Sequence, residues 1–62
     1  MTKEEIKKQI KELEEDNATL HDYLYNGRPT IAEKSEIRNK IKANNLGLIR
    51  LKNALVCMNE NQ

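Results

Sequence analysis

The stretch LGLIRLKNALVCM, residues 46–58, decides the fold of this chain. Nine of its thirteen residues are apolar, and on a helix they would cover nearly the whole circumference. A helix without a continuous polar face must be buried on several sides. The chain has only 62 residues, and a single core in so short a chain rarely contributes more than about 3–5 kcal/mol. We therefore expect this helix to be covered by a second chain.

Upstream of this stretch, residues 2–25 form the first predicted helix. Thr2 and Glu5 have the spacing of a capping box, and Met1 and Ile6 are placed to form a hydrophobic staple. Beyond the cap, seam residues recur at alternating intervals of four and three, which is the spacing of a heptad seam. They are Ile6, Ile10, Leu13, Asn17, Leu20 and Leu24.

A turn is predicted at residues 26–29. Gly27 suits a left-handed helix cap, and Pro29 disfavours helix at Arg28. Thr30 and Glu33 then form a second capping box.

The second predicted helix covers residues 30–58, followed by a frayed tail at residues 59–62. Its seam continues the same spacing through Ile37, Ile41, Asn44, Leu48, Leu51, Leu55 and Met58. Residues 44–47, Asn-Asn-Leu-Gly, could also break it, since glycine costs about 1 kcal/mol in a helix. The unbroken seam favours one continuous helix; the alternative is a kink that gives three helices.

The predicted fold is a single all-α domain over residues 1–62, an antiparallel helical hairpin that dimerises into a four-helix bundle. Charge favours the pairing, because residues 1–26 carry a net charge of −3 and residues 30–62 a net charge of +3. The apolar surface of the second helix places that helix inside the bundle. The predicted oligomer interface is Ile41, Asn44, Leu46, Leu48, Ile49, Leu51, Leu55, Val56 and Met58.

Two asparagines interrupt otherwise apolar seams. Asn17 and Asn44 lie at similar levels of the hairpin, and a buried asparagine can fix the register of paired helices. We expect them to form such a polar layer; the alternative is that both occupy partly exposed, loosely packed positions.

Motifs for catalysis or cofactor binding are missing from the sequence. It has no glycine-rich phosphate loop and no paired-cysteine or paired-histidine metal motif. His21 is the only histidine and Cys57 the only cysteine, and we expect them to be a surface residue and a small hydrophobe. We predict no enzymatic activity, no cofactor, no metal and no small-molecule substrate.

The composition indicates the cellular compartment of the protein and the kind of genome that encodes it. No apolar run approaches the roughly 20 residues of a membrane span, and a single thiol without a signal peptide indicates a cytoplasmic protein with no membrane partner. The excess of lysine, asparagine and isoleucine is typical of AT-rich coding sequences, such as those of low-GC bacteria and their phages.

Two surfaces are candidates for recognition. The hairpin tip gathers residue types that are common at interface hot spots, with His21, Tyr23, Tyr25 and Arg28 as the partner-binding candidates; the alternative is that the tyrosines only cover the end of the hairpin. A basic row, Lys34, Arg38 and Lys42, could instead follow phosphates.

The sequence therefore predicts a small self-associating protein that acts by binding a protein target, as a regulator, adaptor or inhibitor. A nucleic-acid-binding hairpin dimer is the alternative.

Overall fold

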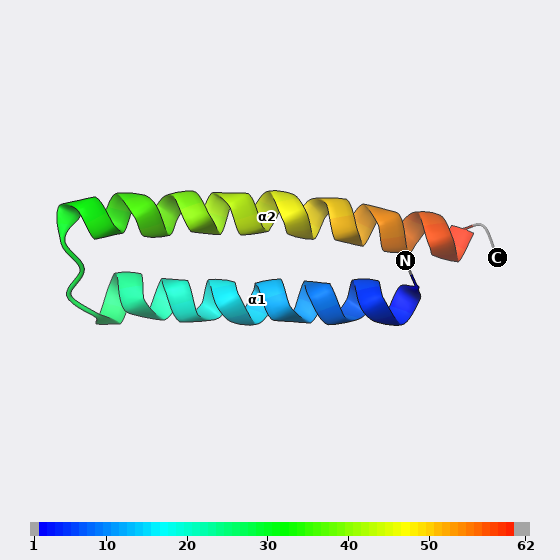
Figure 1. Cartoon of the computed structure of the whole chain (residues 1–62), viewed down its shortest axis with the longest axis horizontal. Helices are drawn as coiled ribbons and strands as arrows, with labels where there is room; N and C mark the ends of the chain where they lie inside the picture. The colour runs from blue at the N-terminus through cyan, green and yellow to red at the C-terminus, as the bar shows by residue number, and fades with distance from the viewer. Residues whose placement is uncertain (1, 61–62) are drawn as a thin grey trace.

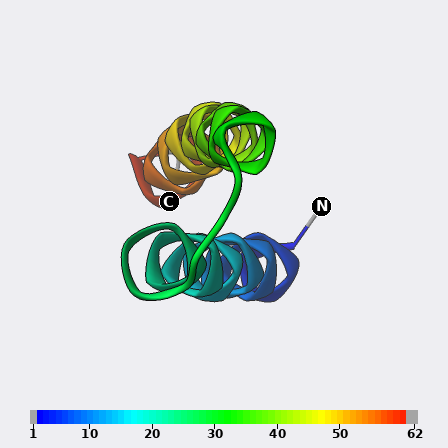
Figure 2. The same cartoon turned by 90° about the vertical axis from the view of Figure 1, so that its left-hand side faces the viewer.

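The structure, a computed structural model, describes residues 2–60, which form two helices joined by a short loop. α1 spans Lys3–Asn26 and α2 spans Ile31–Glu60. The helices lie side by side and run in opposite directions (Figure 1), and the hairpin measures 48 × 15 × 14 Å. Viewed along its length, the two helices are inclined to each other (Figure 2). The predicted all-α antiparallel hairpin is confirmed.

The start of α1 follows from its capping residue. Thr2 has an extended backbone, and its Oγ1 accepts a hydrogen bond of 3.2 Å from the Glu5 backbone N–H. This bond satisfies one of the amides that the first turn of a helix leaves unpaired. The predicted staple involves Met1, which lies outside the described residues.

The end of α1 corrects the prediction for Gly27. Its φ is −82°, so it has an extended and not a left-handed backbone, and its N–H donates to the Tyr23 carbonyl at 3.0 Å. Glycine is needed here because a Cβ would lie 2.6 Å from the Tyr23 carbonyl oxygen and 2.9 Å from the Tyr23 ring. The predicted left-handed cap was therefore wrong, and close packing explains the glycine instead.

α2 begins with a complete capping box. The Glu33 N–H donates to Thr30 Oγ1 at 3.2 Å, and the Thr30 N–H donates to Glu33 Oε1 at 3.1 Å. The helix continues through residues 59 and 60, two residues beyond its predicted end. The remainder of the predicted tail, residues 61–62, lies outside the described residues.

Gly47 does not interrupt α2, which is helical from Ile31 to Glu60. The predicted continuous helix therefore holds, and there is no kink that would give three helices. An added Cβ at Gly47 would lie 3.3 Å from Leu13 Cδ1. The glycine thus lets α1 approach α2 closely at this level.

The core lies along the line of contact between the helices and is divided into two parts. Ile6, Ile10 and Leu48 form a buried cluster toward the open end, with Leu13, Leu51, Leu55 and Met58 packed against it. Toward the loop, Ile37 and Ile41 are also buried. Both predicted seams therefore face each other within one chain.

Candidate interaction surfaces

Asn17 joins the two helices in the middle of the hairpin and is only 9% exposed. Its Nδ2 donates to Asn45 Oδ1 at 2.9 Å, and its Oδ1 accepts from Asn44 Nδ2 at 2.9 Å. Asn44 Nδ2 also donates to Asp16 Oδ2 at 2.8 Å. Both hydrogen-bonding atoms of the buried Asn17 amide are thus satisfied from α2, as buried polar groups must be.

The predicted contact between Asn17 and Asn44 is therefore confirmed, and it is made within one chain. Asp16 and Asn45 also belong to this layer and were not predicted. Asp16 directly precedes Asn17 and Asn45 directly follows Asn44. That adjacency was the available signal. We call the four residues the polar layer.

An apolar strip lies on the side of α2 that does not pack on α1. Leu46, Ile49 and Val56 are 59%, 56% and 52% exposed. Asn53, also exposed, occupies the position between Ile49 and Val56 at the same three-and-four spacing. We call these four residues the outer face. Large apolar side chains gathered on one exposed helix face are typical of an interaction surface.

The predicted oligomer interface divides into two groups. Ile41 and Leu48 are buried in the hairpin's own core, and four further members are half-buried along the same seam: Asn44, Leu51, Leu55 and Met58. The prediction assigned these six to contact between chains, whereas α1 of the same chain covers them. The period of the seam does not say which helix will pack on it. Leu46, Ile49 and Val56 remain exposed.

At the loop end, Tyr23 connects α1 to the start of α2. Its hydroxyl donates to Glu33 Oε2 at 3.0 Å, and its ring lies against Gly27. The side chain is still 43% exposed. Tyr23 therefore closes the end of the hairpin, which agrees with the structural alternative considered for the tyrosines.

Hydrogen bonds shift the pKa values of Tyr23 and Glu33 in opposite directions. The hydrogen bond to Glu33, together with the carboxylate charge, raises the pKa of the Tyr23 hydroxyl above 10.0. The Thr30 backbone N–H and then the Tyr23 hydroxyl lower the pKa of the Glu33 carboxyl below 4.5. Both shifts favour the neutral phenol and the charged carboxylate, the forms that make this bond.

The other tip candidates remain free for contact. The ring of Tyr25, 74% exposed, stacks on the ring of His21 with centroids 5.9 Å apart and planes within 6°. Arg28 is exposed in the loop. His21 and Tyr25 are four positions apart on α1, the spacing of neighbouring side chains on a helix, and their rings form an exposed aromatic pair.

The basic row is exposed along α2, since Lys34, Arg38 and Lys42 all face solvent. Among the residues that the structure describes, the hydrogen bonds between helices are made instead by the polar layer and by Tyr23 with Glu33. The row is therefore a set of solvated positive charges.

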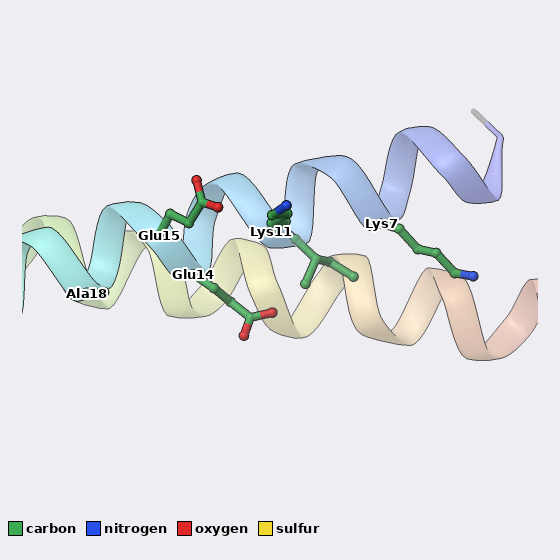
Figure 3. A pocket seen from close by; sticks show the side chains of 6 residues that line it. Lys7, Lys11, Glu14, Glu15 and Ala18 are labelled. Atoms are coloured by element: carbon green, nitrogen blue, oxygen red, sulfur yellow. The ribbon is translucent and has the colours of Figure 1, made fainter.

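A hollow of about 320 Å³ lies on α1 and is lined by Lys7, Ile10, Lys11, Glu14, Glu15 and Ala18. All six residues belong to one helix, and Glu14 and Glu15 point to different sides of it (Figure 3). Small-molecule sites are concave and place a few polar groups so that they converge. This hollow is an open gap along one helix and lacks that arrangement.

Within residues 2–60, no group of three or more His, Cys, Asp or Glu side chains is placed to hold a metal ion. Cys57 is exposed on α2 and is not part of the core. Neither described helix is long and apolar enough to cross a membrane. No protein-family model, curated protein or solved structure matches the chain.

Proposed function

We propose that this chain is a small, non-catalytic protein-binding hairpin that self-associates through α2 and binds a protein target through the surface left free. The outer face carries the proposal. Three half-exposed apolar side chains on one helix leave an apolar strip in water, and covering it releases that water.

Protein, and not a small molecule, is the partner class that this surface suits. An isolated helix face has no enclosing walls, whereas a second helix can lay its own side chains between those of the first. With its outer face against α2 of another chain, α2 of each chain would lie inside an assembly of four helices and α1 outside.

The tip is the surface we assign to the target protein. Tyrosine and arginine are over-represented among the residues that dominate binding energy, and Tyr25, stacked on His21, is held on a helix end. A rigid aromatic side chain loses little conformational entropy when a partner covers it. Binding there would let the protein act as a regulator, adaptor or inhibitor, in the manner of many small bacterial and phage proteins.

The exposed thiol of Cys57 is consistent with a reducing compartment. We therefore propose that the protein acts in the cytoplasm.

Self-association is tested by sedimentation equilibrium over a hundredfold concentration range. The average molar mass of the wild-type protein is expected to rise with concentration. The double variant Ile49→Lys with Val56→Lys is expected to remain a monomer with the helicity of the wild type. The tip variant Tyr25→Ala with Arg28→Ala is the matched control and is expected to associate as the wild type does. A wild-type protein that stays monomeric throughout would contradict the proposal.

Target binding is tested by affinity capture from the cells that encode the protein. A genuine target would be retained by the wild type and lost with the tip variant. If the wild type and the tip variant retain the target equally well, the tip is not the target-binding surface.

Nucleic acid is the second candidate, and the exposed basic row is the observation that favours it. Phosphate contacts release counterions, so such binding weakens steeply as salt rises. The expected result under our main proposal is no salt-dependent retention of RNA or DNA. Tight binding that Lys34→Glu with Arg38→Glu abolishes would establish the alternative.

A further inference from the structure

Asn26 and Gly27, where α1 ends, form the only Asn-Gly pair in the sequence. Asparagine is a chemically labile residue. A following glycine makes it most labile, because glycine has no side chain to hinder attack by its own backbone nitrogen on the asparagine amide carbon. Asn26 is exposed. The pair therefore places a reactive amide at the tip of the hairpin.

Two hydrogen bonds hold this pair in the closed tip. The Gly27 N–H, the group that would attack, donates to the Tyr23 carbonyl at 3.0 Å. Asn26 Nδ2, the group that would leave, donates to Asp22 Oδ1 at 2.8 Å. Asn26 is also the last residue of α1, and a helical backbone holds the next nitrogen away from the residue's own side-chain carbonyl carbon. Ring closure therefore requires the last turn of α1 to open.

The position of Asn26 at a helix end makes this opening accessible. Helix ends open with a much smaller free energy than helix interiors. Five other asparagines lie inside α1 or α2, where opening disrupts more of the structure, and none of them precedes a glycine: Asn17, Asn39, Asn44, Asn45 and Asn53. Chemistry and position therefore both single out Asn26.

We propose that Asn26 is a site of spontaneous deamidation, and that opening of the last turn of α1 sets the rate. The Gly27 nitrogen loses its proton and bonds to Asn26 Cγ. The Cγ–Nδ2 bond breaks, and the leaving amide takes up a proton and departs as ammonia, which leaves a five-membered succinimide. Water then opens this ring at either carbonyl and gives aspartate or isoaspartate at position 26. The inference goes beyond the proposed function and does not rest on it.

Deamidation would loosen the tip. The new carboxylate replaces the amide that donated to Asp22, and like charges four positions apart on a helix repel. It also adds negative charge at the C-terminal end of α1, which the helix dipole disfavours. Isoaspartate lengthens the backbone before Gly27 and so moves its N–H away from the Tyr23 carbonyl. Tyr25 and Arg28 flank the pair, so the change falls within the surface that we assign to the target.

Peptide mapping by mass spectrometry measures the conversion of each asparagine. The full chain is kept at neutral pH in native buffer and, in parallel, in guanidinium chloride. In native buffer we expect position 26 to convert at least tenfold faster than Asn39 and Asn53, which are exposed on α2. In guanidinium chloride it should convert at least threefold faster still, because unfolding frees the last turn. Asn26→Gln, whose longer side chain does not close this ring readily, is the control.

Tyr23→Ala removes the ring that lies against Gly27. This variant should convert faster than the wild type in native buffer and equally fast in guanidinium chloride. The converted wild-type chain, separated by ion exchange, should melt below the unconverted chain, whereas aged Asn26→Gln should melt as it did when fresh.

Three results would overturn parts of this proposal. Conversion at position 26 no faster than at Asn39 and Asn53 would overturn the site itself. Equal wild-type rates in native buffer and in guanidinium chloride would overturn the control of the rate by the last turn of α1. Equal melting of the converted and unconverted chains would overturn the loosening of the tip.

Discussion

Asn44 Nδ2 lies 2.9 Å from Asn17 Oδ1 and links α2 to α1 at the middle of the hairpin. The apolar cluster around Ile6, Ile10 and Leu48 lies on one side of this bond, and the buried Ile37 and Ile41 lie on the other. A shift of one helix along the other would separate the asparagines and bury them unpaired. The polar layer therefore penalises registers that an apolar seam alone would tolerate.

Asn17→Ala is expected to lower the free energy of unfolding by about 1–3 kcal/mol, because it removes both hydrogen bonds that Asn17 makes to α2. Urea denaturation measures this change. Asn39→Ala, an exposed asparagine on α2, is the control and should shift stability by no more than about 0.5 kcal/mol. Equal effects from both variants would show that the layer contributes nothing specific.

Replacing Asn17 and Asn44 together by leucine should have the opposite effect on stability. Exchanging both partners of a buried hydrogen bond for apolar groups is close to neutral or stabilising, so the double variant should melt at or above the wild-type temperature. Its amide NMR spectrum should nevertheless broaden or double, because several registers become comparable in energy. A single sharp spectrum would refute the register role.

Gly47→Ala is expected to stabilise the protein by about 0.5 kcal/mol. Alanine gains about 0.8–1.0 kcal/mol of helix propensity over glycine, and the new Cβ would lie 3.3 Å from the end of the Leu13 side chain, which can move slightly. Gly47→Leu should instead cost about 1–3 kcal/mol through overpacking. Thermal melts of both variants test the prediction, and a less stable alanine variant would contradict it.

Gly27→Ala should destabilise the hairpin by about 1–3 kcal/mol, although its φ of −82° suits any residue. The cause is the 2.6 Å approach that a Cβ would make to the Tyr23 carbonyl oxygen, which is backbone and cannot simply rotate away. Asn26→Ala at the preceding position is the control. An alanine variant as stable as the wild type would mean that the loop relaxes freely.

The pH dependence of stability should report the bond between Tyr23 and Glu33. The lowered pKa of Glu33 means that its stabilising contribution is present above 4.5 and is lost as pH falls through the folded-state value. The raised pKa of Tyr23 means that its contribution is present below 10.0 and is lost as pH rises through the folded-state value. Between pH 4.5 and pH 10.0, wild type should therefore have a higher melting temperature than Tyr23→Phe. This gap in melting temperature should close as the pH falls below that range or rises above it. A gap that is constant from pH 3 to pH 11 would contradict this.

Sequence patterns predicted the parts of the fold that depend on local chemistry. The heptad spacing gave both helices, and Thr30 with Glu33 gave the start of α2, because capping involves residues only three positions apart. The contact of Asn17 with Asn44 followed from their equal level in a hairpin. The left-handed cap predicted at Gly27 was wrong because such a cap and a close approach to Tyr23 both favour a residue without a Cβ.

The surfaces were harder to predict than the fold. The seam spacing separated Leu48, which is buried, from its neighbour Ile49, which is exposed. It did not show that α1 of the same chain would cover the seam, because the spacing is the same for contact within a chain and between chains. The i,i+4 spacing of His21 and Tyr25 makes them neighbours on α1, but the parallel orientation of their rings depends on rotamers that the spacing does not fix.

The central claim is that the outer face of α2 is an interaction surface between copies of this chain. A dilution series of amide ¹H–¹⁵N NMR spectra tests it most directly, residue by residue. We predict concentration-dependent shifts at Leu46, Ile49, Asn53 and Val56, with the amides of Lys7 and Lys11 on α1 unchanged. Spectra that do not change with concentration, or shifts confined to α1 or the tip, would contradict the claim.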